Sequence, residues 1–102
     1  MKECCKTYLN EQFGDDEAVV NEIYGEYVSS VRVKIMEATT ALTGSTWQQL
    51  DRVAHTVKGN ALAAGDNEMA DVAIQLRNAA QLQDAAQARE LIARLGELEK
   101  LL

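Results

Sequence analysis

The chain has 102 residues, 47% of them hydrophobic and 25% charged, and its formal net charge is −6. This length predicts one domain over residues 1–102, with a core that needs no disulfide or metal to hold it. No apolar run approaches the roughly 18 residues of a membrane span. The start of the chain lacks the apolar segment of a secretory signal, so we expect a cytoplasmic protein. The acidic balance argues against nucleic-acid binding, which normally uses a basic face.

One histidine and two adjacent cysteines limit the possible chemistry. A site with several imidazoles and a zinc finger with four spaced ligands are both excluded within one chain. Neighbouring cysteines rarely reach unstrained disulfide geometry, so we expect Cys4 and Cys5 to be reduced thiols near a mobile terminus. A transient metal or redox role stays open for them. The lone His55 is therefore the first candidate for any chemistry.

Apolar periodicity predicts helices nearly throughout and no strand. The first helix is expected over residues 5–13, with Tyr8, Leu9 and Phe13 on its apolar side. Gly14 is expected to end it.

A long second helix is expected next, capped by Asp15 or Asp16 and ended by Thr43-Gly44. Residues 31–35 alternate like a strand, but the helical pattern continues on both sides, so we predict helix. Gly25 falls inside this helix, and the sequence gives no reason for a glycine there. The apolar stripe is Val20, Ile23, Tyr24, Tyr27, Val28, Val31, Ile35, Ala38 and Leu42.

Three further helices follow, each with its own start signal. Ser45 with Gln48 forms a capping box for the third helix, Asp66 caps the fourth and Asp84 opens the last. Gly65 suits the left-handed end of the third helix. The apolar stripes are Trp47, Leu50, Val53, Ala54, Val57, Ala61 and Ala64; Met69, Val72, Ala73, Leu76 and Ala80; and Ala88, Leu91, Ile92, Leu95, Leu98 and Leu102.

Short connections between long amphipathic helices indicate antiparallel neighbours. The predicted fold is therefore all-α: an up-and-down antiparallel four-helix bundle with a short additional N-terminal helix. The chain contains no proline, which fits uninterrupted helices.

His55 falls off the apolar stripe of its helix, and Arg52, Lys58, Gly59 and Leu62 do so too. Lys58 and Gly59 are three and four residues on, so they share the face of the imidazole. A neutral imidazole can attack a phosphoryl group through a ring nitrogen, and a nearby ammonium can neutralise the added charge. Gly59 lets another protein's backbone approach, and Leu62 can form a dry contact around the site. The plainer interpretation is a solvated histidine.

The segment Ala54-His55-Thr56-Val57-Lys58-Gly59-Asn60-Ala61, with Gly65 ten residues after the histidine, resembles the signature of histidine-containing phosphotransfer (HPt) domains. Phe13-Gly14-Asp15 before the long helix and Trp47 eight residues before His55 also resemble this family. The resemblance extends from about residue 8 to residue 102, and the family fold is the predicted bundle.

The resemblance implies a phosphoryl carrier that relays the group between receiver-domain aspartates in a two-component phosphorelay. His55 would be the phosphoacceptor, Lys58 would stabilise the phosphoryl group and Gly59 would give clearance for the receiver. The receiver would supply Mg²⁺, so no cofactor of its own is expected. Partners would be receiver domains and a hybrid sensor histidine kinase, and the protein would be a monomer. We expect no enzyme activity, since no glycine-rich nucleotide loop is present.

Two positions depart from the family pattern. Asn60 replaces a small residue, and either hydrogen-bonds a docked partner or is a neutral surface residue. Arg77 stands 22 residues after His55, where many relatives carry an acidic or amide residue. We hypothesise that Arg77 attracts the phosphoryl group or stabilises phospho-His55, with Arg52 as a further contact. The alternative for Arg77 is a solvated arginine at the edge of the stripe.

Two other functions remain open at this stage. The bundle can be a non-catalytic helical adaptor or dimerisation module in which His55 is incidental. It can also be a fragment of a hybrid sensor histidine kinase. Kinase dimerisation motifs usually place an acidic residue directly after the histidine, whereas Thr56 follows here.

Overall fold

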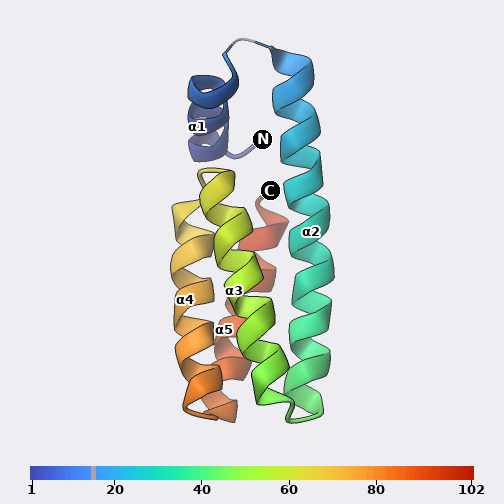
Figure 1. Ribbon diagram of the computed structural model, residues 1–102, viewed down its shortest axis with the longest axis vertical. Helices are drawn as coiled ribbons and strands as arrows, with labels where there is room; N and C mark the ends of the chain where they lie inside the picture. Colours follow the sequence, from blue (N-terminus) through green and yellow to red (C-terminus); the bar gives the residue numbers. More distant parts are fainter. Residues whose placement is uncertain (15) are drawn as a thin grey trace.

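The computed structural model describes residues 1–14 and 16–102, and all regular structure in these ranges is helical (Figure 1). The all-α prediction is confirmed, and residues 31–35 lie inside a helix. No helix in the described ranges is both long and apolar enough to cross a bilayer. The five helices are α1 (Glu3–Phe13), α2 (Glu17–Thr43), α3 (Trp47–Ala63), α4 (Asn67–Gln81) and α5 (Ala85–Lys100).

The four longer helices lie side by side along the long axis of the molecule, which measures 44 × 20 × 18 Å (Figure 1). α3 packs against α2 and α4, and α5 packs against α4 and α2. The short α1 contacts α2 and lies beyond the ends of α3 and α4 (Figure 1). The N- and C-termini come close together beside α2 (Figure 1).

Most of the core comes from the predicted stripes, but it also contains Cys5, Ala41, Ala70 and Ala79, which the stripes did not include. Seven residues of the predicted stripes are only partly buried: Tyr8, Ile23, Val28, Ile35, Leu42, Trp47 and Leu102. Each long helix has apolar residues at three- and four-residue steps, and burying that stripe stabilises the helix more than its intrinsic propensity does. Phe13 is an exception: it is 46% exposed, because α1 ends there and turns its Cys5–Leu9 side toward the bundle. The largest fully buried apolar side chains are Leu9, Leu50, Met69, Leu76, Leu95, Val31, Val53 and Val57.

Three aspartates cap helices through their side chains. The carboxylates of Asp16, Asp66 and Asp84 accept hydrogen bonds from the backbone N–H three residues on, at 3.3, 3.3 and 3.1 Å. Each bond satisfies one of the amides that a helix start leaves without a partner. The predicted caps are thereby confirmed for α2, α4 and α5, while the alternative cap Asp15 lies outside the described residues.

The predicted capping box at Ser45 and Gln48 is wrong. Ser45 adopts a left-handed φ of 54° and belongs to the turn, so α3 begins at Trp47 with Thr46 as its N-cap residue. The Thr46 hydroxyl donates back to the carbonyl of Ala41 at 3.2 Å and does not cap α3. The Thr46 hydroxyl thus satisfies a carbonyl at the C-terminal end of α2.

Asp66 does more than cap α4. It is fully buried, and its carboxylate accepts hydrogen bonds from the Tyr27 hydroxyl at 2.7 Å and from the Lys2 ammonium at 2.8 Å. These partners come from α2 and from the residue before α1. Burying a carboxylate is costly unless charged and hydrogen-bonding partners surround it, as they do here. One side chain therefore joins α1, α2 and the start of α4.

Tyr24 ties the two ends of the chain to α2. Its hydroxyl accepts a hydrogen bond from the Lys2 N–H at 3.2 Å and donates one to the Leu102 carbonyl at 3.0 Å. The ring lies 6.3 Å from that of Tyr27, at an interplanar angle of 58°. The two tilted rings are both buried and belong to the core.

The N-terminal segment is built into the core. Both cysteines are free, as predicted, but Cys5 is completely buried and only Cys4 is exposed. The expectation of two thiols near a mobile terminus is therefore wrong for Cys5. Gly65 takes the predicted left-handed conformation, at φ 76°, and a Cβ there would lie 2.3 Å from the Cβ of Tyr8. Glycine at this turn allows α1 to approach it closely.

We predict that Asp66→Ala destabilises the protein more than Asp84→Ala. Both variants lose an N-cap, worth about 1 kcal/mol. Asp66→Ala also leaves the buried Tyr27 hydroxyl without its acceptor, which costs roughly 1–3 kcal/mol more. Urea unfolding of the two variants measures the difference. Equal losses would show that the buried contacts of Asp66 add nothing to the cap.

A second prediction concerns alkaline pH. Burial, and next the charge of Asp66, raises the pKa of the Cys5 thiol from 9.0 to about 12. Burial likewise raises the pKa of Tyr24 and Tyr27. Above pH 9 the unfolded chain therefore binds fewer protons than the folded chain, so stability falls as pH rises. Burial lowers the pKa of Lys2, but the hydrogen bond and charge of Asp66 outweigh this and raise it, so the Lys2 contribution is lost at still higher pH.

In the unfolded chain the Cys5 thiol titrates at lower pH than Tyr24, Tyr27 or Lys2. Its contribution to the pH dependence of stability can therefore be measured separately. Between pH 9 and pH 10, the free energy of unfolding should fall less steeply in Cys5→Ala than in the parent. Cys4→Ala is the matched control, because it removes an exposed neighbouring thiol and leaves the buried one in place. Identical slopes in the parent and Cys5→Ala would contradict the prediction.

Candidate functional site

His55 lies on the outer face of α3. Its neighbours Val53, Ala54 and Val57 are buried in the core, and the helical turn therefore directs His55 away from it. The imidazole is exposed, and Lys58, one turn along, is partly exposed. The structure thus places both side chains on one accessible stretch of helix.

Gly59 leaves the surface beside the imidazole clear. A Cβ at this position would meet no atom within 4 Å, so packing inside the protein does not require glycine here. Glycine in a helix interior costs about 1 kcal/mol relative to alanine. A stretch of bare backbone therefore lies one turn from His55, open to anything that approaches the helix. Gly25 is equally open, and nothing in the structure explains it.

Arg77 reaches His55 from α4. Its Nη1 lies 3.3 Å from the imidazole Nδ1, and its Nε donates to Oδ1 of Asp51 at 3.0 Å. The same Asp51 oxygen accepts a hydrogen bond from Nε2 of Gln81 at 3.2 Å. Arg77 therefore contacts the ring directly and is not simply a solvated arginine. Asp51 and Gln81 complete a polar row with Arg77, and Gln81 is the member that gave no signal in the sequence.

Arg52 lies before His55 on α3, and Leu62 lies after it. Arg52 is exposed, and its carbonyl accepts a hydrogen bond from the Thr56 hydroxyl at 3.1 Å. In the part of the chain that the structure describes, no hydrogen bond joins Arg52 to the imidazole ring. Leu62 is 47% exposed and lines a groove between α3 and α1 with Cys4 and Tyr8. The structure thus brings Arg77 to His55 and leaves Arg52 and Leu62 at the surface around it.

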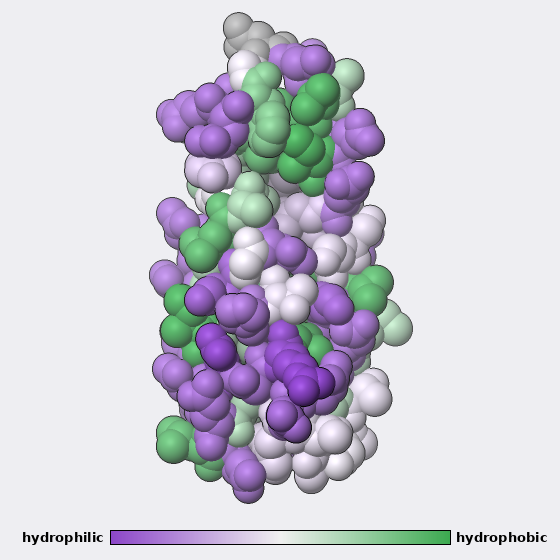
Figure 2. Space-filling model, viewed as in Figure 1, coloured by the Kyte–Doolittle hydropathy of each residue, from purple (hydrophilic) through white to green (hydrophobic). Residues whose placement is uncertain are grey.

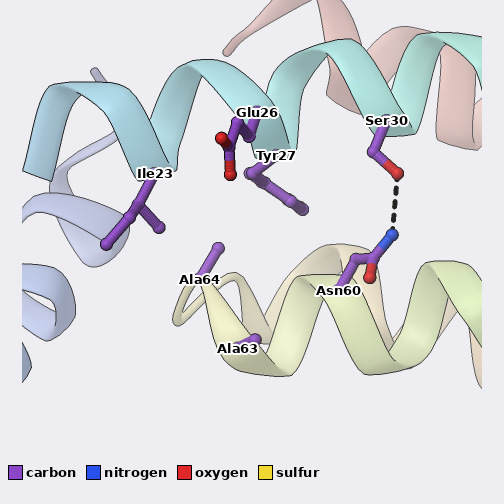
Figure 3. A pocket seen from close by; sticks show the side chains of 7 residues that line it. All are labelled: Ile23, Glu26, Tyr27, Ser30, Asn60, Ala63 and Ala64. Atoms are coloured by element: carbon purple, nitrogen blue, oxygen red, sulfur yellow. Dashed lines mark hydrogen bonds between the residues drawn. The ribbon is translucent and has the colours of Figure 1, made fainter. Parts of the chain in front are cut away.

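Asn60 faces α2. Its side-chain amide donates to the Ser30 hydroxyl at 2.8 Å and ties α3 to α2 (Figure 3). It also lines an open pocket of about 260 Å³ between these helices. The pocket does not include His55. The full lining is Ile23, Glu26, Tyr27, Ser30, Asn60, Ala63 and Ala64 (Figure 3).

The surface in this region is mostly polar. Figure 2 shows hydrophilic side chains over much of the middle and lower part of this face, with separate apolar spots and a larger apolar area toward the α1 end. An imidazole that stands on an open helix surface is accessible to a large partner. Deep pockets, by contrast, enclose most of a small ligand.

The chain matches the model of a known protein family. The family model described as Hpt domain matches residues 22–102. The match begins inside α2 and includes all of α3, α4 and α5, whereas α1 lies before it. Neither a curated protein nor a solved structure matches the chain.

Proposed function

The chain belongs to the Hpt domain family, and we propose that it relays a phosphoryl group between receiver-domain aspartates through phospho-His55. Hpt domains serve in histidine phosphotransfer within phosphorelays. The observation that carries the assignment to His55 is its position: it is the single histidine, exposed on α3, with Lys58 and Gly59 one turn along.

The proposed transfer needs one nucleophile and charge neutralisation. A lone pair of the His55 ring attacks the phosphorus of the receiver's aspartyl phosphate. An N–P bond forms, the P–O bond to the aspartate breaks, and its electron pair leaves with the carboxylate. The Lys58 ammonium, on the same face, stabilises the phosphoryl oxygens. Arg77 and Arg52 are the further cations that we propose as phosphoryl or partner contacts.

The surface around His55 supports docking of a receiver. Gly59 gives clearance beside the reactive ring, and Leu62 supplies an apolar contact at the edge. In this proposal Asn60 lies beside the contact surface, held by Ser30. Local cations face the acidic pocket of a receiver, even though the whole chain has a net charge of −6. The receiver supplies Mg²⁺, and the protein acts as a carrier without kinase activity of its own.

We also propose the finer description of the fold. Residues 1–102 form one domain in which α2 to α5 make an up-and-down antiparallel four-helix bundle, with α1 as the additional helix. The short connections support this, as does the packing of each long helix on two others. We propose a cytoplasmic monomer that exchanges phosphoryl groups with receiver domains and with a hybrid sensor histidine kinase.

Phosphorylation by a receiver tests the proposal directly. Incubation with a receiver domain, its aspartate phosphorylated by acetyl phosphate and Mg²⁺, is expected to give an acid-labile, base-stable label on the protein. His55→Gln should abolish the label while leaving the helical fold intact, because the imidazole is exposed. No label from any receiver of a complete set from the source organism would favour the adaptor function.

A glycine substitution tests the proposed docking surface. Gly59→Gln is expected to stabilise α3 by up to about 1 kcal/mol, since glutamine is a better helix former. It should slow transfer from the receiver by at least about tenfold, because its side chain occupies the approach to His55. Gly96→Gln is the matched control: a Cβ at Gly96 also meets nothing within 4 Å, and Gly96 lies on α5 and not on the helix that carries His55. Equal transfer rates in the two variants would contradict the proposal that Gly59 leaves room for the receiver beside His55.

A further inference from the structure

The contact between Arg77 and His55 determines where the ring carries its proton. A guanidinium has only N–H donors and no acceptor. At the observed Nη1–Nδ1 separation of 3.3 Å, Nδ1 is therefore the acceptor. In a neutral imidazole one nitrogen accepts and the other carries the hydrogen. The proton of the neutral ring is thus on Nε2.

The guanidinium is held where it is by a second contact. Nε of Arg77 donates to Oδ1 of Asp51 at 3.0 Å, and Gln81 donates to the same oxygen at 3.2 Å. The Arg77 side chain is 38% exposed and that of Asp51 27%, so the row lies at the surface and is partly shielded. Asp51 keeps one side of the guanidinium fixed and directs the other toward the ring.

In this arrangement neither ring nitrogen offers a free lone pair. The lone pair of Nδ1 accepts the hydrogen bond from Arg77, and Nε2 carries the hydrogen. Attack by Nε2, the nitrogen farther from the helix backbone, requires the proton to be on Nδ1. That tautomer would point an N–H at a guanidinium that cannot accept it.

We infer that Arg77 is a positioning residue that holds the neutral His55 ring in the Nε2–H tautomer and restrains transfer until a docking receiver draws the guanidinium away. This inference rests on the proposed function. When the phosphoryl oxygens of the receiver arrive, they compete for the Nη1 donors of Arg77. Nδ1 is then free to take the ring proton, and the lone pair of Nε2 forms the N–P bond. The P–O bond to the receiver aspartate breaks, its electron pair leaves with the carboxylate, and the proton stays on Nδ1.

The tautomer can be measured without any receiver. His55 is the only histidine, so ¹⁵N-histidine labelling gives one ring whose two nitrogen shifts report the site of the proton. At a pH where the ring is neutral, the parent is expected to show the Nε2–H form. Arg77→Gln, whose amide oxygen can accept from Nδ1–H, should shift the population toward the Nδ1–H form. Arg52→Gln removes a nearby cation and is expected to leave the tautomer unchanged.

The restraint itself is measured with phosphoramidate, a small phosphoryl donor that needs no docking surface. Arg77→Gln and Arg77→Ala are each expected to be phosphorylated up to about tenfold faster than the parent, the effect of losing about one hydrogen bond. Arg94→Gln, which removes a cation from the exposed side of α5, should react at the parent rate.

Two results would overturn the inference. One is the same tautomer population in the parent, Arg77→Gln and Arg77→Ala. The other is labelling by phosphoramidate that is no faster in either Arg77 variant than in the parent; slower labelling would make Arg77 an activating residue. The ring measurement is independent of receivers, so failure of receiver-dependent labelling would count against the relay and not against the tautomer.

Discussion

The structure depends most on the buried carboxylate of Asp66. Alone, such a group would be expelled to water, but here a tyrosine hydroxyl, an ammonium and a backbone amide surround it. Its partners Lys2 and Tyr27 are 64 and 39 residues away in the chain. Because the buried carboxylate is stabilised only when all of these donors contact it together, they fix how α1 and α2 sit against the turn between α3 and α4. That turn ends the helix that carries His55, so the scaffold of the candidate site is fixed at the same point.

Apolar periodicity sufficed to predict the helices and most of their buried residues, because a helix removes its apolar stripe from water by packing that face against other helices. It missed the buried alanines Ala41, Ala70 and Ala79. Caps were predictable where a side chain acts within its own turn, as Asp16 and Asp84 do. The cap predicted at Ser45 was wrong because a hydroxyl between two helices can bond to the end of the first or to the start of the second. Here the neighbouring Thr46 hydroxyl bonds to the Ala41 carbonyl at the end of α2. The burial of Cys5 was not predicted for another reason: the contacts that hold the N-terminal segment in the core come from residues far away in the chain, such as Tyr24 and Asp66.

For the candidate site, the spacing on α3 placed Lys58 and Gly59 beside His55 correctly, since a helix repeats every 3.6 residues. The resemblance to Hpt domains also drew attention to Arg77. Sequence reasoning did not reach the hydrogen bonds from Arg77 and Gln81 to Asp51, because these bonds join two helices and depend on their relative rotation. A pattern along one helix contains no information about which side chain of the next helix meets it.

The groove beside Leu62 connects the site to the start of the chain. The Hpt match begins at residue 22, yet α1, which lies before it, forms one wall of this groove. Any partner that covers Leu62 therefore also touches side chains that lie before the matched region. In the proposed relay, α1 therefore contributes to the surface that meets a receiver, although it carries none of the residues proposed to handle the phosphoryl group.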